Sequence, residues 1–254
     1  MPEKARSDLV VRAVRGSHNL ETVGSLARWL QVVLEVIPLN TIHCMDCLQG
    51  LREIPDKSID LVITDPPYGI GEAAGKNKNR NQLTQAKDYG NLEWDNQIPT
   101  AEYFDEIFRI SKNQIIFGGN YFGLPPSPCW IVWDKDNSGD FADAELAWTS
   151  FKSAVRIFKW KWNGMLQEDM KHKEDRIHPT QKPVKLFEWI IKNYVKEGDV
   201  ICDPFFGSGS CLVAAVRMGH PFIGFEKEPT YFEKAQIRIK KAQEQGKLKG
   251  SWFE

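Results

Sequence analysis

The feature that most constrains the fold of this chain is a glycine-rich turn between an apolar run and a helix-forming run. Residues 200–202 (Val-Ile-Cys) predict a buried strand, and the turn Asp-Pro-Phe-Phe-Gly-Ser-Gly-Ser follows at 203–210. Residues 211–218 predict a helix, and residues 222–225 predict a second strand that ends at Glu226. A strand, a tight turn, a helix and another strand in this order form one unit of a parallel α/β sheet.

The same alternation of strands and helices extends over most of the 254 residues. Further strands are predicted at residues 40–44, 59–64, 114–117, 129–133 and 144–150, and helices are predicted before Leu51 and at residues 101–111, 184–194 and 229–244. We therefore predict an α/β fold with a doubly wound, mostly parallel sheet that carries helices on both faces. This domain should span residues 39–254 and follow an N-terminal extension, residues 1–38, with one amphipathic helix at 25–37.

The composition excludes several classes of protein. The formal net charge is −1, so any basic surface that binds nucleic acid would be confined to one part of the protein. No run of about eighteen apolar residues occurs, so we expect no membrane partner. The five cysteines are irregularly spaced, which favours reduced thiols in a cytoplasmic protein. Cys44 and Cys47 form a C-x-x-C pair without a second ligand pair, so we expect no metal.

A second constraining feature is Asp65-Pro66-Pro67-Tyr68, directly after the predicted strand at 59–64. The Asp65 carboxylate and a backbone carbonyl of the turn can each accept a hydrogen bond from a planar amino group. The two prolines stiffen the turn, and the Tyr68 ring offers a face on which a base can stack. The alternative is an ordinary turn, because Asp and Pro are common turn residues. On the functional interpretation, all four are candidate catalytic residues.

The glycine-rich turn has the pattern of a nucleoside site. Gly207 and Gly209 would let the backbone approach a ligand closely. Glu226 lies 23 residues after Asp203, near the spacing at which an acid reaches a ribose hydroxyl. Leu212 stands where the third glycine of the dinucleotide fingerprint belongs, which argues against a dinucleotide-dependent oxidoreductase.

Two further segments combine basic and polar or aromatic residues in a way that suits nucleic acid. Residues 71–98 form a long polar loop, and residues 151–176 hold seven basic and four acidic residues, with tryptophans between lysines. The candidate DNA-binding residues are Lys76, Lys78, Arg80, Lys87, Lys159, Trp160, Lys161, Trp162 and Arg176. Two alternatives stay open: a solvated loop without a ligand for the first segment, and an amphipathic hairpin that packs its tryptophans inward for the second.

The motifs and their order resemble one protein family, the DNA amino-methyltransferases that use S-adenosylmethionine. The resemblance is to their circularly permuted β-type subgroup, in which the DPPY motif precedes the F-x-G-x-G motif. It runs from about Asn40 to Arg238 and leaves residues 1–38 outside. The motifs that carry it are TDPPYG (64–69), IIFGGNYF (115–122), WIVWDK (130–135), ELAWTSF (145–151), HPTQKP (178–183) and DPFFGSGS (203–210).

The resemblance implies direct transfer of a methyl group from S-adenosylmethionine to the exocyclic amino group of a base in double-stranded DNA. Asp65 and the Pro66 carbonyl would accept hydrogen bonds from that amino group, and Tyr68 would stack on the flipped base. Thr180 and Lys182 would approach the methionine carboxylate, Asp46 the adenine amino group of the cofactor, and Glu226 its ribose. The full set of implied cofactor-binding residues is Asp46, Asp65, Thr180, Lys182, Asp203, Phe205, Gly207, Gly209, Ser210 and Glu226.

The resemblance also implies which segments and which base are involved. Residues 151–176 occupy the family's target-recognition position, and the loop at 71–98 would share the task. Asp65 favours adenine-N6 methylation, because permuted cytosine-N4 members often carry Ser there; cytosine-N4 methylation is the alternative. A homodimer, which the apolar helix near Trp29 could serve, and a cognate restriction endonuclease are partners that the resemblance allows.

Two more distant alternatives concern the class of substrate and the loss of activity. A methyltransferase of RNA or of a protein amide would usually carry the cofactor motif first, so the permuted order argues against it. A non-catalytic DNA-binding module would keep the fold, but it would not need both Asp65 and Tyr68.

Overall fold

The computed structural model describes residues 38–69, 98–137, 142–163 and 166–250, and of residues 247–250 only the backbone. Its elements in chain order are β1 (Thr41–Cys44), α3 (Cys47–Glu53), β2 (Ile59–Thr64), α4 (Ala101–Ile110), β3 (Ser111–Phe117), the 3-10 helix η4 (Gly119–Tyr121), β4 (Trp130–Asp134), β5 (Ala144–Thr149), β6 (Arg156–Lys159), β7 (Trp162–Asn163), β8 (Leu166–Gln167), α5 (Val184–Tyr194), β9 (Ile201–Asp203), α6 (Ser210–Arg217), β10 (Phe222–Glu226) and α7 (Pro229–Gly250). Every strand and helix predicted within residues 39–244 is present, and β2 and α5 have the predicted bounds.

The central sheet has eight strands in the order β1-β10-β9-β2-β3-β5-β4-β6. Neighbouring strands are parallel except where β5 pairs with β3 and β4. The prediction of a mostly parallel, doubly wound sheet is thus confirmed. The last two strands in the sequence, β9 and β10, lie between β1 and β2, so the C-terminal part of the chain is built into the sheet beside the first strands.

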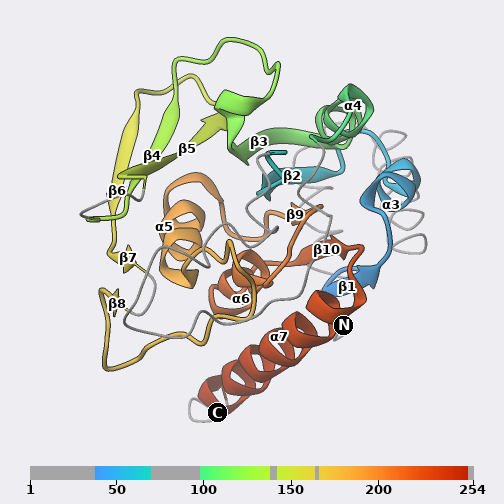
Figure 1. Ribbon diagram of the computed structural model, residues 1–254. Helices are drawn as coiled ribbons and strands as arrows, with labels where there is room; N and C mark the ends of the chain where they lie inside the picture. Colours follow the sequence, from blue (N-terminus) through green and yellow to red (C-terminus); the bar gives the residue numbers. More distant parts are fainter. Residues whose placement is uncertain (1–37, 70–97, 138–141, 164–165, 251–254) are drawn as a thin grey trace.

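Helices cover both faces of the sheet (Figure 1). The side chains of β2 alternate between the two faces. Leu61 and Ile63 join the cluster formed with α5, α6 and α7, whereas Val62 joins the cluster formed with α3 and α4. A strand buried on both faces needs a nearly continuous apolar run, which explains why its bounds were predictable.

Part of the segment at 151–176 belongs to the central sheet, which was not predicted. Residues Arg156–Lys159 form β6, an edge strand parallel to β4. An edge strand has one hydrogen-bonded neighbour, and three of the four residues of β6 are exposed, so the sequence there lacks a buried apolar run. The residues that follow form the small antiparallel hairpin of β7 and β8, outside the central sheet.

Several predictions from the sequence concern residues outside the described ranges. These are the helix at 25–37, nearly all of the loop at 71–98, and the loop's basic residues Lys76, Lys78, Arg80 and Lys87. The boundary of the N-terminal extension, the homodimer and the restriction endonuclease also stay predictions. None of the helices in the described part of the chain has the length and apolar character needed to cross a bilayer. Nor do the described residues include a group of three or more candidate metal ligands.

Candidate active site

The sheet order places the two predicted turns next to each other. Strand β2 leads into Asp65, and β9 ends at Asp203. These strands are parallel neighbours, although 138 residues separate the two aspartates. The hydroxyl of Thr64 donates a hydrogen bond to Oδ1 of Asp203 over 3.0 Å, and both side chains are buried. The topology thus forms one site at the carboxyl ends of the strands, where open α/β sheets bind ligands.

Both carboxylate oxygens of Asp65 have a partner. The phenol of Tyr68 donates to Oδ1 over 2.6 Å. The ammonium of Lys182 donates to Oδ2 and lies 3.0 Å from Oε2 of Glu145 on β5. Lys135, which follows β4, forms an ion pair with the other oxygen of Glu145. Two carboxylates and two ammonium groups therefore alternate in a row that joins four separate parts of the chain.

Burial and mutual charge set the ionisation of this row. Burial would lower the pKa of Lys182, but the charges of Asp65 and Glu145 outweigh it and raise this pKa. Burial acts to raise the pKa of Glu145, whereas Lys182 and Lys135 bring it down to about 2. Burial also raises the pKa of Asp65, and the charge on Glu145 adds to this rise against the opposing effect of Lys182. Lys182 is therefore a cation near pH 7, and Asp65 takes up a proton more readily than Glu145 does.

The ring of Tyr68 lies among aromatic neighbours. It stacks on the ring of Tyr121 with centroids 5.0 Å apart and meets the ring of Phe122 edge-on. Gly118 has a φ of +67°, and a Cβ at this position would lie 2.1 Å from a ring carbon of Tyr68. Glycine is therefore required at Gly118 both for its backbone conformation and for the space it leaves. Tyr121 is 45% exposed, so Tyr68 already carries a stacked ring at the surface of the site.

The turn after β9 depends on backbone conformation. Gly207 and Gly209 have φ of +47° and +72°, in the left-handed region that favours glycine. The N–H of Gly207 donates to Oε2 of Glu226 over 2.9 Å, and the N–H of Glu228 donates to Oε1 over 2.8 Å. A carboxylate has about four acceptor positions, so Glu226 retains capacity for further donors such as hydroxyl groups.

Asp46 lies two residues after β1, whose last residue, Cys44, pairs with Glu226 of β10. Asp46 therefore lies near Glu226 at the end of the sheet. Its Oδ1 accepts a hydrogen bond from the N–H of Leu48 over 2.9 Å, which caps α3. Its Oδ2 accepts from the hydroxyl of Tyr103 over 2.8 Å. Both oxygens therefore have structural partners, and the role toward a cofactor stays a prediction.

The HPTQKP segment divides between the two turns. Nδ1 of His178 accepts from the N–H of Thr180 over 3.3 Å, and its Nε2 would lie 3.5 Å from a Cβ at Gly207. Burial lowers the pKa of His178 to about 3, so this ring is neutral near pH 7. Thr180 is thus held beside the glycine turn, whereas Lys182, only two residues later, reaches Asp65.

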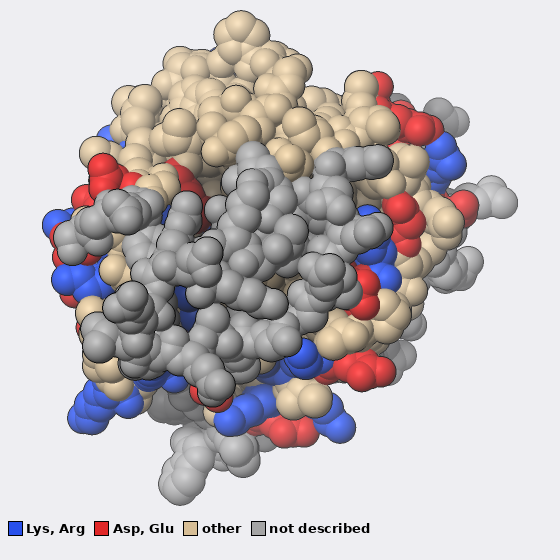
Figure 2. Space-filling view, viewed as in Figure 1, with Lys and Arg blue, Asp and Glu red and all other residues tan. Residues whose placement is uncertain are grey.

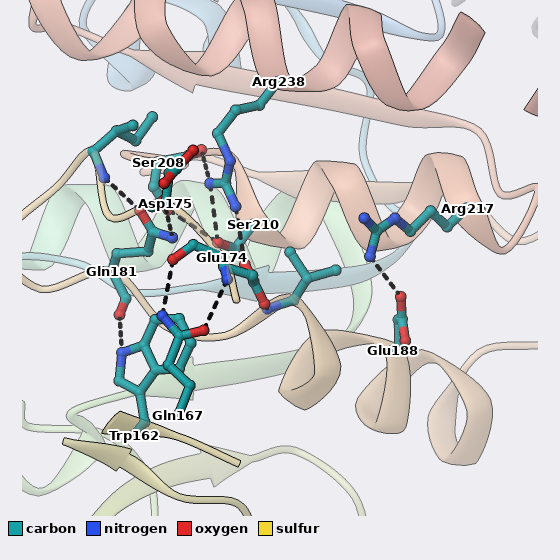
Figure 3. Close-up of polar contacts among 12 residues, drawn as sticks. Trp162, Gln167, Glu174, Asp175, Gln181, Glu188, Ser208, Ser210, Arg217 and Arg238 are labelled. Atoms are coloured by element: carbon teal, nitrogen blue, oxygen red, sulfur yellow. Dashed lines mark hydrogen bonds and ion pairs between the residues drawn. The ribbon is translucent and has the colours of Figure 1, made fainter. Parts of the chain in front are cut away.

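A half-buried arginine on α7 ties the glycine turn to the segment at 151–176 (Figure 3). Arg238 donates to the carbonyl of Ser208 over 2.6 Å and to the hydroxyl of Ser210 over 3.3 Å. Its other terminal nitrogen donates to Oε2 of Glu174 over 3.0 Å. Oε1 of Glu174 accepts from the N–H of Val184, the first residue of α5, over 2.9 Å. The turn is therefore held against two helices by one guanidinium and one carboxylate.

The candidate DNA-binding residues at 151–176 fall into two groups. Lys159 and Lys161 are exposed, and their ammonium groups lie 2.8 and 3.0 Å from the carboxylate of Asp136. Trp162 is 6% exposed, and its indole N–H donates to the carbonyl of Gln181 over 2.9 Å (Figure 3). Trp162 is thus a core residue whose ring is not available to stack on a base.

The inward-packing hairpin, left open above, accounts for both tryptophans. Trp160 packs against the same hydrophobic cluster that contains Trp162. The guanidinium of Arg176 lies over the Trp162 ring, and one of its nitrogens donates to the carbonyl of Pro179 over 2.9 Å. On the face shown in Figure 2, described lysines and arginines are interspersed with aspartates and glutamates. Lys159 and Lys161 stay predictions as DNA-contacting residues of this segment, whereas the two tryptophans pack inward.

Three residues of the site were not predicted as functional from the sequence. Glu145 is an acid inside the predicted strand of the ELAWTSF motif, and a charged residue in a buried strand is a signal that could have identified it. Gly118 stands in the IIFGGNYF motif directly after a strand, which suggested a turn but not a contact with Tyr68. Arg238 is one of many basic residues in α7, and nothing in the pattern distinguishes it.

Comparison with known proteins agrees with this geometry. A family model described as DNA methylase, of the N6 and N4 type, matches residues 128–237. The type II methyltransferase M.HinfI of Haemophilus influenzae is 30% identical in sequence, and the match covers 80% of this chain and 68% of that protein.

Two solved structures are more distant in sequence. The cytosine-N4-specific PvuII DNA methyltransferase is 20% identical with a TM-score of 0.50, covering 78% of this chain and 86% of its own. The M1.HpyAVI–SAM complex is 24% identical with a TM-score of 0.47, covering 78% and 98% of the two chains. The PvuII likeness supports the fold, and with the family match and the similarity to M.HinfI it follows that this chain belongs to the N6/N4 family of S-adenosylmethionine-dependent DNA amino-methyltransferases.

Proposed function

We propose that this protein methylates the N6 amino group of an adenine that has flipped out of duplex DNA. The observation that carries the proposal is the adjacency of the Asp65 turn and the glycine turn at the ends of the parallel neighbours β2 and β9. One turn offers acceptors for an amino group, and the other has the backbone conformation of a nucleoside site. A target base and a methyl donor would therefore bind at the ends of neighbouring strands.

The described residues fit S-adenosylmethionine as the methyl donor. Gly207 and Gly209 leave the turn without side chains that would block a ligand, and Glu226 keeps acceptor capacity for ribose hydroxyls. Asp46, near Glu226 in the sheet, would receive the adenine amino group of the donor. Thr180 would meet the methionine part beside the glycine turn. Of the other residues predicted for the cofactor, Asp203, Phe205 and Ser210 lie in this turn, whereas Lys182 lies on Asp65 at the other turn.

The chemistry required of the protein is positioning and proton acceptance. When bound, S-adenosylmethionine supplies a methyl group on a sulfonium, and a nitrogen lone pair can attack this methyl group while the sulfur leaves as a neutral thioether. Asp65 and the carbonyl of Pro66 would accept hydrogen bonds from the amino group and aim its lone pair. The nitrogen becomes positively charged as the new N–C bond forms and the C–S bond breaks, and it then loses one proton. Burial raises the pKa of Asp65, which suits its carboxylate to accept that proton.

Adenine is proposed over cytosine because of Asp65, the residue that differs from the Ser of many permuted cytosine-N4 enzymes. The fold does not separate the two bases, since the PvuII enzyme is cytosine-N4-specific by name and shares the fold. Tyr68 would stack on either base, so its ring carries no preference. Asp65 is therefore the part of the site on which the choice of base depends.

The test is to identify the modified base directly. DNA from a host that has no methylation of its own, expressing this chain, would be hydrolysed to nucleosides and analysed by mass spectrometry. We expect N6-methyldeoxyadenosine, and we expect none in DNA from the same host without the chain. N4-methyldeoxycytidine instead would establish the rival base, and unmodified DNA from cells with folded protein would contradict the proposal.

A further inference from the structure

A single buried ammonium group stands between two carboxylates in the site. The side chain of Lys182 is 4% exposed, and its Nζ donates to Oδ2 of Asp65 while lying 3.0 Å from Oε2 of Glu145. The same Nζ lies 3.3 Å from the hydroxyl of Tyr68. Lys182 therefore takes one acceptor position of Asp65 and brings a positive charge to the place where a base amino group would bind.

This occupation opposes the proposed reaction in two ways. With Tyr68 on Oδ1 and Lys182 on Oδ2, about half of the four acceptor positions of the Asp65 carboxylate are taken. In addition, the reacting nitrogen gains positive charge as the N–C bond forms, and an ammonium group beside it would raise the energy of that charge in a poorly solvated site. Lys182 must therefore move away from Asp65 before the amino group of the base can react.

Glu145 provides the place to which Lys182 can move. Its Oε2 is buried and accepts no hydrogen bond of good geometry from the described residues, although Nζ of Lys182 is only 3.0 Å away. The other oxygen, Oε1, is held by the ion pair with Lys135. Glu145 is thus fixed on β5, and its Oε2 is already in ion-pair contact with the ammonium that donates to Asp65.

We propose that Lys182 alternates between Asp65 and Glu145, and that Glu145 is a positioning residue that draws Lys182 off Asp65 when the target amino group enters. This inference rests on the proposed function of Asp65. In the structure, the ammonium of Lys182 balances the charge of the Asp65 carboxylate. In the reacting arrangement, it stays buried on Glu145, so the row of charges remains balanced throughout.

The test is Glu145→Gln, which keeps the shape of the side chain and removes its charge. Lys182 would then keep its ion pair with Asp65 at neutral pH, and we expect kcat to fall by about 100-fold, the scale of a misplaced reacting group. The affinity for S-adenosylmethionine should change little. Because the variant lacks one of the two charges that raise the pKa of Lys182, its activity should recover as the pH is raised above neutral, while the wild-type rate stays nearly level.

Glu188→Gln is the matched control. Glu188 lies on α5, and its side chain is 19% exposed against 25% for Glu145. It also pairs with two cations, Lys185 and, as Figure 3 shows, Arg217. Removing its charge should leave kcat and the pH profile of the rate unchanged.

A second arm tests whether Glu145 acts through Lys182. In a Lys182→Met background, Glu145→Gln should cost no further activity at saturating S-adenosylmethionine, because the ammonium that it directs is gone. A third arm needs no activity: the pKa of Lys182, followed by NMR of lysine labelled at Cε and assigned with Lys182→Arg, should be lower in Glu145→Gln than in the wild type.

The outcomes separate the two proposals. Failure of the wild type to methylate DNA would overturn the proposed function, and the NMR titration would still decide whether Glu145 holds Lys182. Wild-type kcat in Glu145→Gln, or a loss of activity without recovery at high pH, would overturn the alternation of Lys182. An unchanged pKa of Lys182, or an additive loss in the double variant, would overturn it as well.

Discussion

The two turns of the site begin alike and are stabilised differently. Each starts with an aspartate at the end of a parallel strand, Asp65 after β2 and Asp203 in β9. The carboxylate of Asp65 is met by Lys182, 117 residues away, and by the hydroxyl of Tyr68 within its own turn. The carboxylate of Asp203 accepts from the hydroxyl of Thr64 and from the N–H of Phe205. The carboxylate of the first turn thus depends on a charged donor, Lys182, and that of the second turn on neutral donors alone.

This difference implies a division of labour. Charged side chains can change partners while the backbone stays in place, which suits the turn that must admit a base and accept a proton. A backbone turn with Gly207 and Gly209 in left-handed conformations has few alternatives, which suits a fixed binding surface. Changes at the first turn should therefore affect methyl transfer, and changes at the second should affect cofactor affinity.

The largest effect is expected for Asp65→Ala. Removing the acceptor should lower kcat by at least about 100-fold, toward the background rate, because the amino group loses both its orientation and its proton acceptor. Cofactor affinity, measured by calorimetry, should stay within about threefold of the wild type if the cofactor depends on the other turn. Asp56→Ala, an exposed aspartate away from the site, is the control and should change neither quantity. A rate close to that of the wild type would contradict the role of Asp65.

The opposite result is expected for Gly207→Val. A β-branched residue at φ +47° strains the turn by about 1–3 kcal/mol, so S-adenosylmethionine should bind roughly 5- to 150-fold more weakly. Gly123→Val is the control, because Gly123 has no positive φ and a Cβ there meets nothing within 4 Å. Equal dissociation constants for Gly207→Val and the wild type would place the cofactor elsewhere.

The smallest effect is expected outside both turns, for the double change Lys159→Ala and Lys161→Ala. If both lysines contact phosphates, DNA affinity should fall several-fold, and the slope of log K against log salt should decrease by about 1.8. Because both lysines pair with Asp136, part of their attraction for DNA is already offset.

Lys112→Ala is the control for these lysines, since Lys112 is exposed and ion-paired but lies near the start of β3, away from the carboxyl ends of the strands. An unchanged salt slope in the double variant would leave Lys159 and Lys161 as residues that only support the hairpin.

Much of the fold could be read from local patterns. The strands β2, β9 and β10 are short, nearly continuous apolar runs, and α5 follows a periodicity of 3.6; each is bounded by a proline, a glycine or an acid. The edge strand β6 escaped prediction because a strand with exposed side chains has no buried apolar run. Trp162 was predicted as a candidate for DNA contact, but it is buried. Aromatic residues alternate with basic residues in the same way when they bind DNA and when they pack into the core, so the sequence pattern does not separate the two cases.

The sequence by itself determined the order of strands and helices, the DPPY turn and the glycine turn, because these depend on neighbouring residues and on backbone preferences. Only the tertiary structure decided that Lys182 donates to Asp65, that Glu145 forms an ion pair with the same ammonium group, and that Arg238 holds the glycine turn. These contacts join residues that are far apart in the sequence, and they form because buried charges must find partners once the sheet has brought their strands together.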